Sequence, residues 1–266
     1  MTISPVQSGI LRPPLKWAGG KRWLVPYLKT LWALHSGRRL VEPLCGSLAI
    51  TLGLMPDEAL LNDINIHLIN FFRSISKGLQ LQLSMENNED FYYSYRDRFN
   101  RLIREGREET AEAAELFYYL NRTGYNGLCR FNKKGEFNVP FGSYKKINYI
   151  QDFKHYRHQF LQWKFESVDF ELLSLKPADF IYADPPYDVN FTHYSKEGFV
   201  WDDQVRLANW LACHPGPVVL SNQATERIIE LYSGLGFELK FMNAPRLISC
   251  NGNRTPAKEV LATKNI

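Results

Sequence analysis

Hydrophobic and polar positions along the chain alternate between two periodicities. Short apolar runs of the kind that form buried strands occur at 39–42, 59–61, 160–165, 179–183 and 217–221. Segments with helical apolar spacing accompany them at 23–34, 46–54, 64–77, 201–213 and 224–233. The runs 237–242 and 259–263 predict a terminal antiparallel pair. This order of elements predicts an α/β fold with a Rossmann-like core.

The pattern changes in the middle of the chain. Two further helical segments, one charged and one more apolar, follow at 89–105 and 110–121. Over 121–149 the periodicity gives way to glycines, asparagines and aromatic residues, which predicts loops and a hairpin with its turn at 133–136. We therefore expect an α/β core formed by 1–77 and 150–266, with an inserted helical and loop lobe at 78–149.

Composition narrows the class of protein. With 266 residues, 45% hydrophobic and 23% charged, the chain can bury a sizeable core. No apolar run approaches the roughly 20 residues that cross a bilayer, and residues 1–14 lack the pattern of a signal peptide. The four cysteines are far apart without a CxxC pair, which argues against a zinc site and a disulfide framework. We expect a cytoplasmic protein without a metal and without membrane contact.

Basic side chains are concentrated in one part of the chain. Residues 120–160 contain eight lysines and arginines against two acidic residues, an excess of +6, whereas the whole chain carries +4. A local excess of this kind suits contacts with phosphates. A solvated basic surface is the alternative explanation.

Four residues at the end of an apolar run fit a demanding chemical step. Asp184, Pro185, Pro186 and Tyr187 follow the predicted strand at 179–183. An amino group on an aromatic ring is a poor nucleophile because its lone pair is delocalised into the ring. A fixed carboxylate and an adjacent backbone carbonyl can each accept one amine hydrogen and so direct the lone pair towards an electrophile, while the aromatic ring stacks on a flat base. A plain loop entry after a strand is the alternative interpretation.

The turn after the first predicted strand has the composition of a ligand site. Glu42, Pro43 and Gly46 lie where ligands bind in doubly wound sheets, and the glycine lets a ligand approach the backbone closely. Asp63 ends the second strand, where an acid can bind ribose hydroxyls. A helix N-cap is the alternative role for Asp63.

An upstream segment, Lys16-Trp17-Ala18-Gly19-Gly20-Lys21, places two lysines around a glycine pair. It lacks the spacing of a P-loop, so a nucleoside triphosphate is not implied. A cofactor with an adenosine ribose and a free carboxylate would use Asp63, Trp17 and Lys21 together. S-adenosylmethionine has both groups and also the methyl electrophile that the Asp-Pro-Pro-Tyr chemistry requires.

With these residues assembled, the chain resembles the DNA adenine methylase family of amino-methyltransferases. The shared motifs occur in the family's order: KWAGGK at 16–21, the glycine turn at 42–47, NDIN at 62–65, NRTGYNGLCRFN at 121–132, EFNVPFG at 136–142, DPPY at 184–187 and RLISCNGNR at 246–254. The block from 121 to 142 is the most specific. The resemblance implies methyl transfer from S-adenosylmethionine, leaving S-adenosylhomocysteine, to the 6-amino group of adenine in double-stranded DNA, generally within GATC.

The resemblance also assigns roles to individual residues. The catalytic motif is formed by Asp184, Pro185, Pro186 and Tyr187. The expected cofactor site comprises Trp17, Lys21, Glu42, Pro43, Gly46, Asp63, Ser167, Val168 and again Asp184. The residues expected to read or wedge the DNA are Lys16, Tyr125, Asn126, Leu128, Arg130 and Pro140. The chain departs from the family at Ser143, where an arginine is usual, and at Ser47, where glycine or alanine is usual.

Reaching an amine inside a duplex requires that the base be flipped out of the stack. Tyr125 is the candidate wedge for the gap, and Arg130 is the candidate reader of guanine in the major groove. Lysines that would hold phosphates without specifying sequence stand at 133, 134, 145 and 146. The alternatives are that the Tyr125 ring packs inside the lobe and that Arg130 forms an ion pair with Glu136.

Two other functions remain open from the sequence. One is methylation of an adenine or cytosine amino group in RNA, which the same motif would serve. The other is a DNA-binding regulator without catalysis, against which the complete cofactor motifs argue. If the family resemblance holds, we expect a monomer in a bacterial or phage-infected cell, associated with the nucleoid, as a solitary methylase or as part of a restriction-modification pair.

Overall fold

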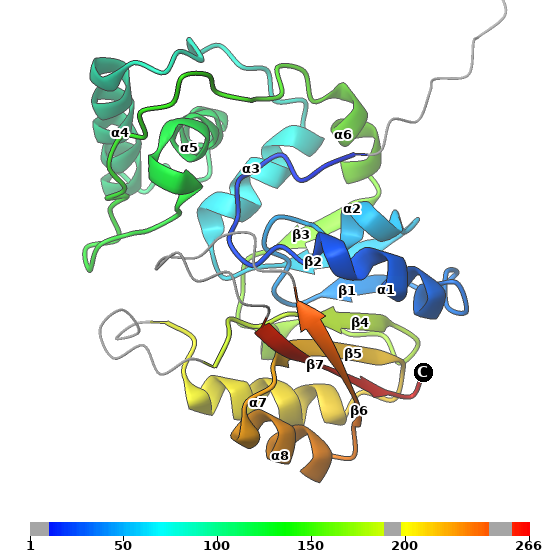
Figure 1. Ribbon diagram of the computed structural model, residues 1–266. Coiled ribbons are helices and arrows are strands. Elements are labelled where there is room, and N and C mark those ends of the chain that lie inside the picture. The colour runs from blue at the N-terminus through cyan, green and yellow to red at the C-terminus, as the bar shows by residue number, and fades with distance from the viewer. Residues whose placement is uncertain (1–10, 189–197, 245–256) are drawn as a thin grey trace, which may run out of the picture.

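A twisted β-sheet forms the centre of the computed structural model, which describes residues 11–188, 198–244 and 257–266 (Figure 1). Within these residues the sheet has seven strands in the order β3-β2-β1-β4-β5-β7-β6. The strands are β1 (Leu40–Glu42), β2 (Ala59–Asn62), β3 (Trp163–Glu166), β4 (Phe180–Ala183), β5 (Val218–Gln223), β6 (Glu238–Ala244) and β7 (Ala257–Lys264).

The pairing of the strands defines a Rossmann-like core. Strands β3, β2, β1, β4 and β5 are parallel, with Val41 of β1 between Leu60 of β2 and Ile181 of β4. Strand β7 is antiparallel to both β5 and β6, so the terminal antiparallel pair expected from the sequence is confirmed. The order 3-2-1-4-5 places the topological switch between β1 and β4, where doubly wound sheets bind ligands. The α/β fold class is therefore confirmed.

Helices cover both faces of the sheet. They are η1 (Arg22–Leu24), α1 (Val25–Trp32), α2 (Thr51–Leu54), α3 (Ile66–Ser76), α4 (Glu89–Arg104), α5 (Ala111–Thr123), η2 (Tyr125–Gly127), α6 (Lys154–Phe160), η3 (Phe170–Leu172), α7 (Trp201–Ala212) and α8 (Glu226–Gly234). Helices α7 and α8 lie on one side and α1, α2 and α3 on the other (Figure 1). Helices α4 and α5 lie farther from the sheet, beyond α3 (Figure 1).

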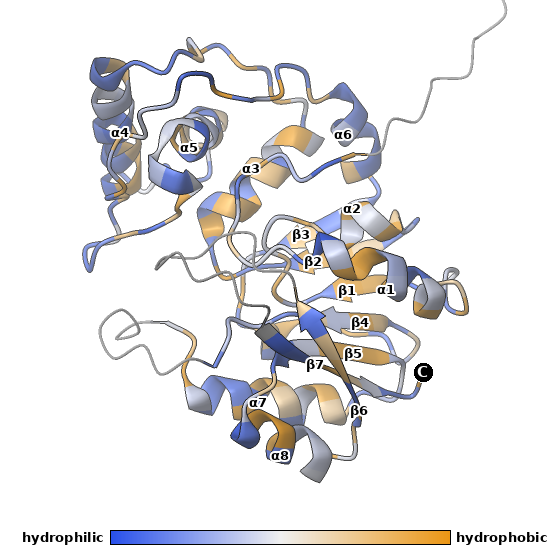
Figure 2. Cartoon of the chain, in the orientation of Figure 1, coloured by the Kyte–Doolittle hydropathy of each residue, from blue (hydrophilic) through white to orange (hydrophobic). Residues whose placement is uncertain are grey.

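Alternate side chains of the strands supply two hydrophobic cores. Leu40 and Phe180 belong to the larger core, which also contains α3 and α5, whereas Val41 and Ile181 belong to the smaller core beneath α7 and α8. This alternation follows from the two-residue repeat of a strand. Figure 2 shows hydrophobic residues along β4 and β5, whereas α4 is largely hydrophilic. The larger core extends to α5, because Phe71 of α3 stacks on Tyr118 of α5 at 5.1 Å between ring centroids.

Two elements begin three or more residues later than expected. The helix expected at 46–54 begins only at Thr51, and the strand expected at 160–165 begins at Trp163, because the chain up to Phe160 belongs to α6. The expected turn at 133–136 is confirmed, since Asn132 N donates to the carbonyl of Glu136 at 2.8 Å. No helix in the described ranges is both long and apolar enough to cross a membrane. The expected motif at 246–254 lies outside the described residues.

Candidate active site

The candidate site lies along one edge of the sheet. Glu42, Asn62 and Asp184 stand at or just beyond the carboxyl ends of the parallel strands β1, β2 and β4. Parallel strands bring these ends to one edge, which is why residues far apart in the sequence meet there. Strand β7 runs the opposite way, so its first residues reach the same edge, and Glu259 lies opposite Gln223 near the end of β5.

A buried lysine is the centre of the hydrogen-bond network at this edge. Lys21 is only 3% exposed. Its Nζ lies 3.0 Å from Asp184 Oδ1, 3.1 Å from Glu259 Oε1 and 3.0 Å from the Tyr187 hydroxyl. Burial lowers the pKa of Lys21, but the two carboxylates outweigh burial and leave the pKa above its ordinary value. The ammonium therefore stays charged and ties the upstream segment to the Asp-Pro-Pro-Tyr motif.

The Asp184 carboxylate is held through one of its two oxygens. Ser221 Oγ donates to Asp184 Oδ1 at 2.9 Å, and the Tyr182 hydroxyl lies 2.9 Å from Ser221 Oγ. Lys21 contacts the same oxygen, whereas Oδ2 accepts no hydrogen bond from the described residues. Burial raises the pKa of Asp184, and the contacts with Lys21 and Ser221 limit that rise. The arrangement fixes the carboxylate and leaves one oxygen for a ligand.

The two prolines after Asp184 present their carbonyls differently. The Pro186 carbonyl accepts a 2.8 Å hydrogen bond from Gln204 Nε2 on α7, and Asn222 Nδ2 in turn donates to Gln204 Oε1 at 3.0 Å. The Pro185 carbonyl accepts none from the residues that the structure describes. Gln204 is 2% exposed and Asn222 is fully buried. This pair anchors the second half of the motif while the Pro185 carbonyl stays available beside Asp184.

Asp63 supports the glycine turn. Its Oδ2 accepts from Gly46 N at 3.1 Å and its Oδ1 accepts from Asn65 N at 2.9 Å. The N-cap interpretation of Asp63 is wrong, because the N-cap of α3 is Asn65, whose side chain accepts from His67 N and Leu68 N. Burial raises the pKa of Asp63, against the effect of its two backbone donors. Asp63 thus links the turn after β1 to the residue that caps α3.

Trp17 and Gly46 are in close contact. Gly46 has a φ of +46°, and a Cβ built on it would lie 2.9 Å from Trp17 Nε1. Only a residue without a side chain combines this φ with this approach. The backbone of the turn is therefore accessible next to an aromatic ring. This agrees with the expectation from the sequence that a ligand approaches the backbone at Gly46.

Glu42 is buried behind the turn. It is 3% exposed, and its Oε1 accepts a 2.8 Å hydrogen bond from Thr51 N and a further bond from the Thr51 hydroxyl. Burial raises the pKa of Glu42 to about 8, although both bonds from Thr51 oppose the rise. Glu42 therefore keeps its proton to a higher pH than an exposed glutamate does.

The side chain of Asn62 brings the remaining expected cofactor residues together. Its Nδ2 donates to the carbonyls of Pro43 at 2.9 Å and Val168 at 3.0 Å, and its Oδ1 accepts from Val168 N at 3.0 Å. The neighbouring Ser167 hydroxyl donates to the carbonyl of Ile64 at 3.3 Å. Pro43, Ser167 and Val168 consequently border the same edge as Asp63.

Lys16 connects this edge to α5. Its backbone pairs with the Asn121 side chain through two 2.8 Å hydrogen bonds, and its Nζ donates to the carbonyl of Arg122 at 3.0 Å. The ammonium also lies 3.9 Å from the centre of the Tyr144 ring. Burial, followed by repulsion from Arg122, lowers the pKa of Lys16 to about 8. Lys16 and Lys21 thus have opposite pKa shifts, because only Lys21 has carboxylate partners.

The other expected DNA contacts lie on an exposed loop. Tyr125 is 52% exposed, so the alternative of a ring packed inside the lobe is wrong. Its backbone N donates to the Pro140 carbonyl at 2.9 Å. The adjacent Asn126 is exposed at a positive φ of 51°, and Leu128 is 37% exposed.

Arg130 is held by its neighbour in the hairpin. Its Nε donates to Asn138 Oδ1 at 2.7 Å and an Nη donates to the Asn138 carbonyl at 3.0 Å. The alternative ion pair with Glu136 is wrong, because Glu136 pairs with Arg104 of α4 at 2.6 Å. Ser143, which stands where the family usually has an arginine, is exposed. The four lysines of this region are also exposed, at positions 133, 134, 145 and 146.

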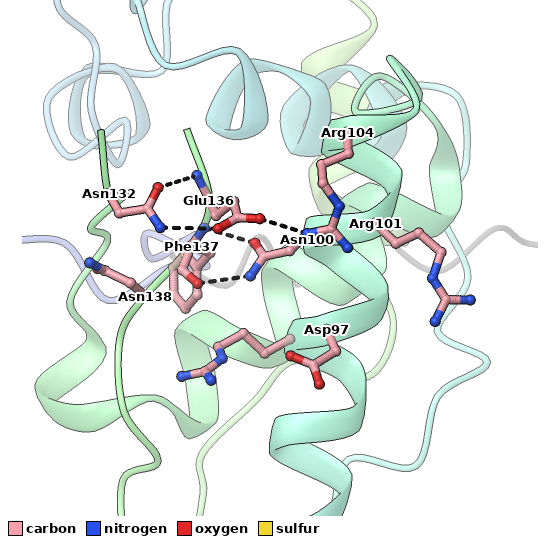
Figure 3. Close-up of a pocket in the computed structure, with 9 residues that line it drawn as sticks. Asp97, Asn100, Arg101, Arg104, Asn132, Glu136, Phe137 and Asn138 are labelled. Atoms are coloured by element: carbon pink, nitrogen blue, oxygen red, sulfur yellow. Dashed lines mark hydrogen bonds and ion pairs between the residues drawn. The ribbon is translucent and has the colours of Figure 1, made fainter. Parts of the chain in front are cut away.

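A pocket of about 440 Å³ lies between α4 and this hairpin (Figure 3). The wall contributed by α4 includes Arg96, Arg101 and Arg104, and Figure 3 shows Arg101 pointing away from the Arg104–Glu136 pair. Asn100 closes the base by exchanging hydrogen bonds with the backbone of Phe137 at 3.0 and 2.8 Å. Arginines of α4 thus add to the basic surface that the sequence placed after residue 120.

Reasoning from the sequence missed Glu259, Ser221, Asn62 and Gln204. The last three are polar residues that bond to Asp184, Val168 and the Pro186 carbonyl, respectively. A polar residue within an otherwise apolar strand was the available signal for Ser221 and Asn62. For Glu259, the signal was an acid at the start of a predicted antiparallel return strand.

Comparison with known proteins gives consistent findings. The family model of D12 class N6 adenine-specific DNA methyltransferases matches residues 17–246. The chain is 36% identical to the Retron Ec67 DNA adenine methylase of Escherichia coli, over 93% of this chain and 90% of that protein. It is 37% identical to a DNA adenine methylase of Vibrio cholerae, over 93% and 94%. A solved SAM-dependent O-methyltransferase of Thermotoga maritima is 9% identical, with a TM-score of 0.40 over 91% of this chain and 64% of that one.

Proposed function

Since this chain belongs to the D12 class of N6 adenine-specific DNA methyltransferases, we propose that it methylates the 6-amino group of adenine within GATC in duplex DNA, with S-adenosylmethionine as methyl donor. The observation that carries the mechanism is that only one of the two Asp184 carboxylate oxygens is hydrogen-bonded by the described residues. Lys21 and Ser221 both bind Oδ1, and Oδ2 faces no donor among the described residues.

Orientation of the target amine is the first task of this site. Asp184 Oδ2 and the Pro185 carbonyl each accept one hydrogen of the amine, which turns the lone pair out of the ring plane. Lys21 opposes the effect of burial on the pKa of Asp184 and so favours the ionised form, which can only accept. Holding a nucleophile in a reactive geometry lowers the barrier by several kcal/mol, up to about 7–11 in model reactions. With the cofactor bound, the amine would take up the methyl group directly, without a covalent enzyme intermediate, and would lose one proton to solvent.

The residues along the sheet edge fit the cofactor. Asp63 is a carboxylate acceptor at the position that binds ribose in such folds, and the Gly46 backbone is open beside Trp17. Lys21 would contribute its charge rather than a hydrogen bond, because its three N–H donors face Asp184, Glu259 and Tyr187. When bound, S-adenosylmethionine supplies an electrophilic methyl group on a sulfonium. Pro43, Ser167 and Val168 would border its adenine, because the Asn62 side chain holds them at the same edge.

The inserted segment, which we assign to 78–149, would recognise the DNA. The exposed Tyr125 ring fills the gap left by the flipped base, and Asn126, Leu128 and Pro140 lie on the same exposed loop. Arg130 binds a guanine in the major groove, and its hydrogen bonds to Asn138 are broken when it does so. Exposed lysines at 133, 134, 145 and 146 hold phosphates.

Methyl transfer from labelled S-adenosylmethionine to duplex oligonucleotides tests the proposal. One duplex contains GATC, and a matched set carries each single base change. We expect label on GATC only. Label on a different or looser set would keep the chemistry but refute the assigned recognition. Transfer to single-stranded RNA and not to duplex DNA would refute the proposed substrate, and cofactor binding without any transfer would indicate a regulator.

A further inference from the structure

Glu259 is a buried acid that the mechanism above does not use. It is 3% exposed and comes from β7, the last strand of the sheet. Because β7 is antiparallel, its beginning lies beside Gln223 at the carboxyl end of β5. The strand direction therefore delivers an acid from the end of the chain into the candidate site.

One carboxylate oxygen of Glu259 binds two other residues of the site. Glu259 Oε1 accepts from Lys21 Nζ at 3.1 Å and from the Tyr187 hydroxyl. The Tyr187 hydroxyl also accepts from Lys21 at 3.0 Å, and Asp184 takes the remaining contact at 3.0 Å. An ammonium has three N–H donors, so these three acceptors match Lys21 completely. Glu259 thus holds both the lysine and the aromatic end of the motif.

The cluster has more acidic than basic side chains. One ammonium, Lys21, contacts two carboxyl groups, Asp184 and Glu259, so it can neutralise only one of them when both are ionised. The nearby Glu42 adds little charge at neutral pH, since burial raises its pKa to about 8. An uncompensated charge away from water is unfavourable, so a cationic ligand gains affinity at such a site.

We propose that Glu259 is a positioning residue whose charge makes the site prefer the sulfonium cofactor over its neutral thioether product. This inference rests on the proposed function, because it takes S-adenosylmethionine and S-adenosylhomocysteine as the two ligands. They differ by one methyl group and one positive charge. Loss of the Glu259 charge would therefore weaken the first and leave the second almost unaffected. For unit charges roughly 10 Å apart at an effective dielectric constant near 20, the effect on affinity is about tenfold.

The test is calorimetric titration of both ligands at pH 7 without DNA. In Glu259→Gln, which keeps an acceptor of the same size, we expect about tenfold weaker binding of S-adenosylmethionine and unchanged binding of S-adenosylhomocysteine. Glu259→Asp keeps the charge and should retain the wild-type ratio of the two affinities. Glu238→Gln, which removes an exposed acid at the far end of the β6–β7 pair, is the matched control and should behave as wild type.

Three outcomes would overturn the inference. They are equal weakening of both ligands in a folded Glu259→Gln, no weakening of either, and loss of the preference in Glu259→Asp as well. Thermal melts of each variant establish that it is folded. Methylation of the GATC duplex by wild type is measured in parallel. Wild type that prefers S-adenosylmethionine to S-adenosylhomocysteine but methylates no duplex would refute the proposed function alone.

Discussion

Burial of Glu42 has a measurable consequence for stability. In the folded protein the pKa of Glu42 is raised from 4.5 to about 8 by burial, with Thr51 as its partner. In the unfolded chain the side chain is solvated and ionises near its ordinary value. Between these two pH values the folded state binds a proton that the unfolded state has lost. The free energy of unfolding therefore falls as pH rises from about 4.5, and stops falling above about 8.

The size of this effect follows from the shift. One pKa unit corresponds to about 1.4 kcal/mol, so the full interval is worth on the order of 5 kcal/mol. Glu42→Gln keeps the length of the side chain and an oxygen for the two Thr51 donors, but cannot ionise. We expect the variant and wild type to have similar stability at pH 5. At pH 8 the variant should be more stable by several kcal/mol.

Urea denaturation at pH 5, 6, 7 and 8, followed by circular dichroism, measures the difference. The exposed Glu238→Gln serves as the control and should follow the wild-type curve at every pH. Parallel pH dependence in wild type and Glu42→Gln would refute the reasoning, because it would mean that Glu42 has the same pKa in the folded and unfolded chains.

Three further substitutions test separate parts of the site. Ser221→Ala removes the hydrogen bond from Ser221 Oγ to Asp184 Oδ1, and a hydrogen bond to a charged group contributes roughly 1.5–3 kcal/mol. The single-turnover rate should therefore fall at least about tenfold. The low-pH side of the pH–rate profile should move to higher pH, because the ionised form of Asp184 is less stabilised. An unchanged rate and pH profile would contradict this role. Gly46→Ala places a methyl group 2.9 Å from Trp17 Nε1 at a positive φ and should weaken cofactor binding in calorimetry while the protein still folds; unaltered affinity would contradict the role of the Gly46 turn in cofactor binding. Arg130→Ala should relax the choice among single-base variants of GATC without weakening cofactor binding, and intact specificity would remove Arg130 as a reader.

The sequence predicted the architecture better than the boundaries. The α/β fold class and the terminal antiparallel pair are confirmed, since apolar runs and turn residues are local signals. The helix expected at 46–54 starts late for tertiary reasons. Cys45 N donates to the Asn62 carbonyl at 2.7 Å, Gly46 N donates to Asp63, and Leu48 has a positive φ of 64°, which a helix does not allow. These bonds come from a strand that is distant in sequence.

The partners of the site residues were less predictable than the residues themselves. The sequence identified Lys21 and Asp184 but did not show that they contact each other at 3.0 Å. It left Asp63 open between a helix cap and a ligand contact, and the structure gives the cap to Asn65. Glu259 was missed because its place depends on the direction of β7 and not on any motif around it.

The most direct test of the central claim is a single-turnover comparison of wild type and Asp184→Asn on a GATC duplex, with the methylated nucleoside identified by mass spectrometry. An asparagine has nearly the shape of Asp184, but it has no negative charge to pair with Lys21. It also replaces one of the two carboxylate oxygens, either of which could accept the amine hydrogen, with an NH2 group. We predict N6-methyladenine at the GATC adenine with wild type, and a rate lower by at least about a hundredfold with Asp184→Asn, at unchanged DNA affinity. A rate within a few fold of wild type, or methylation of another base, would contradict the account.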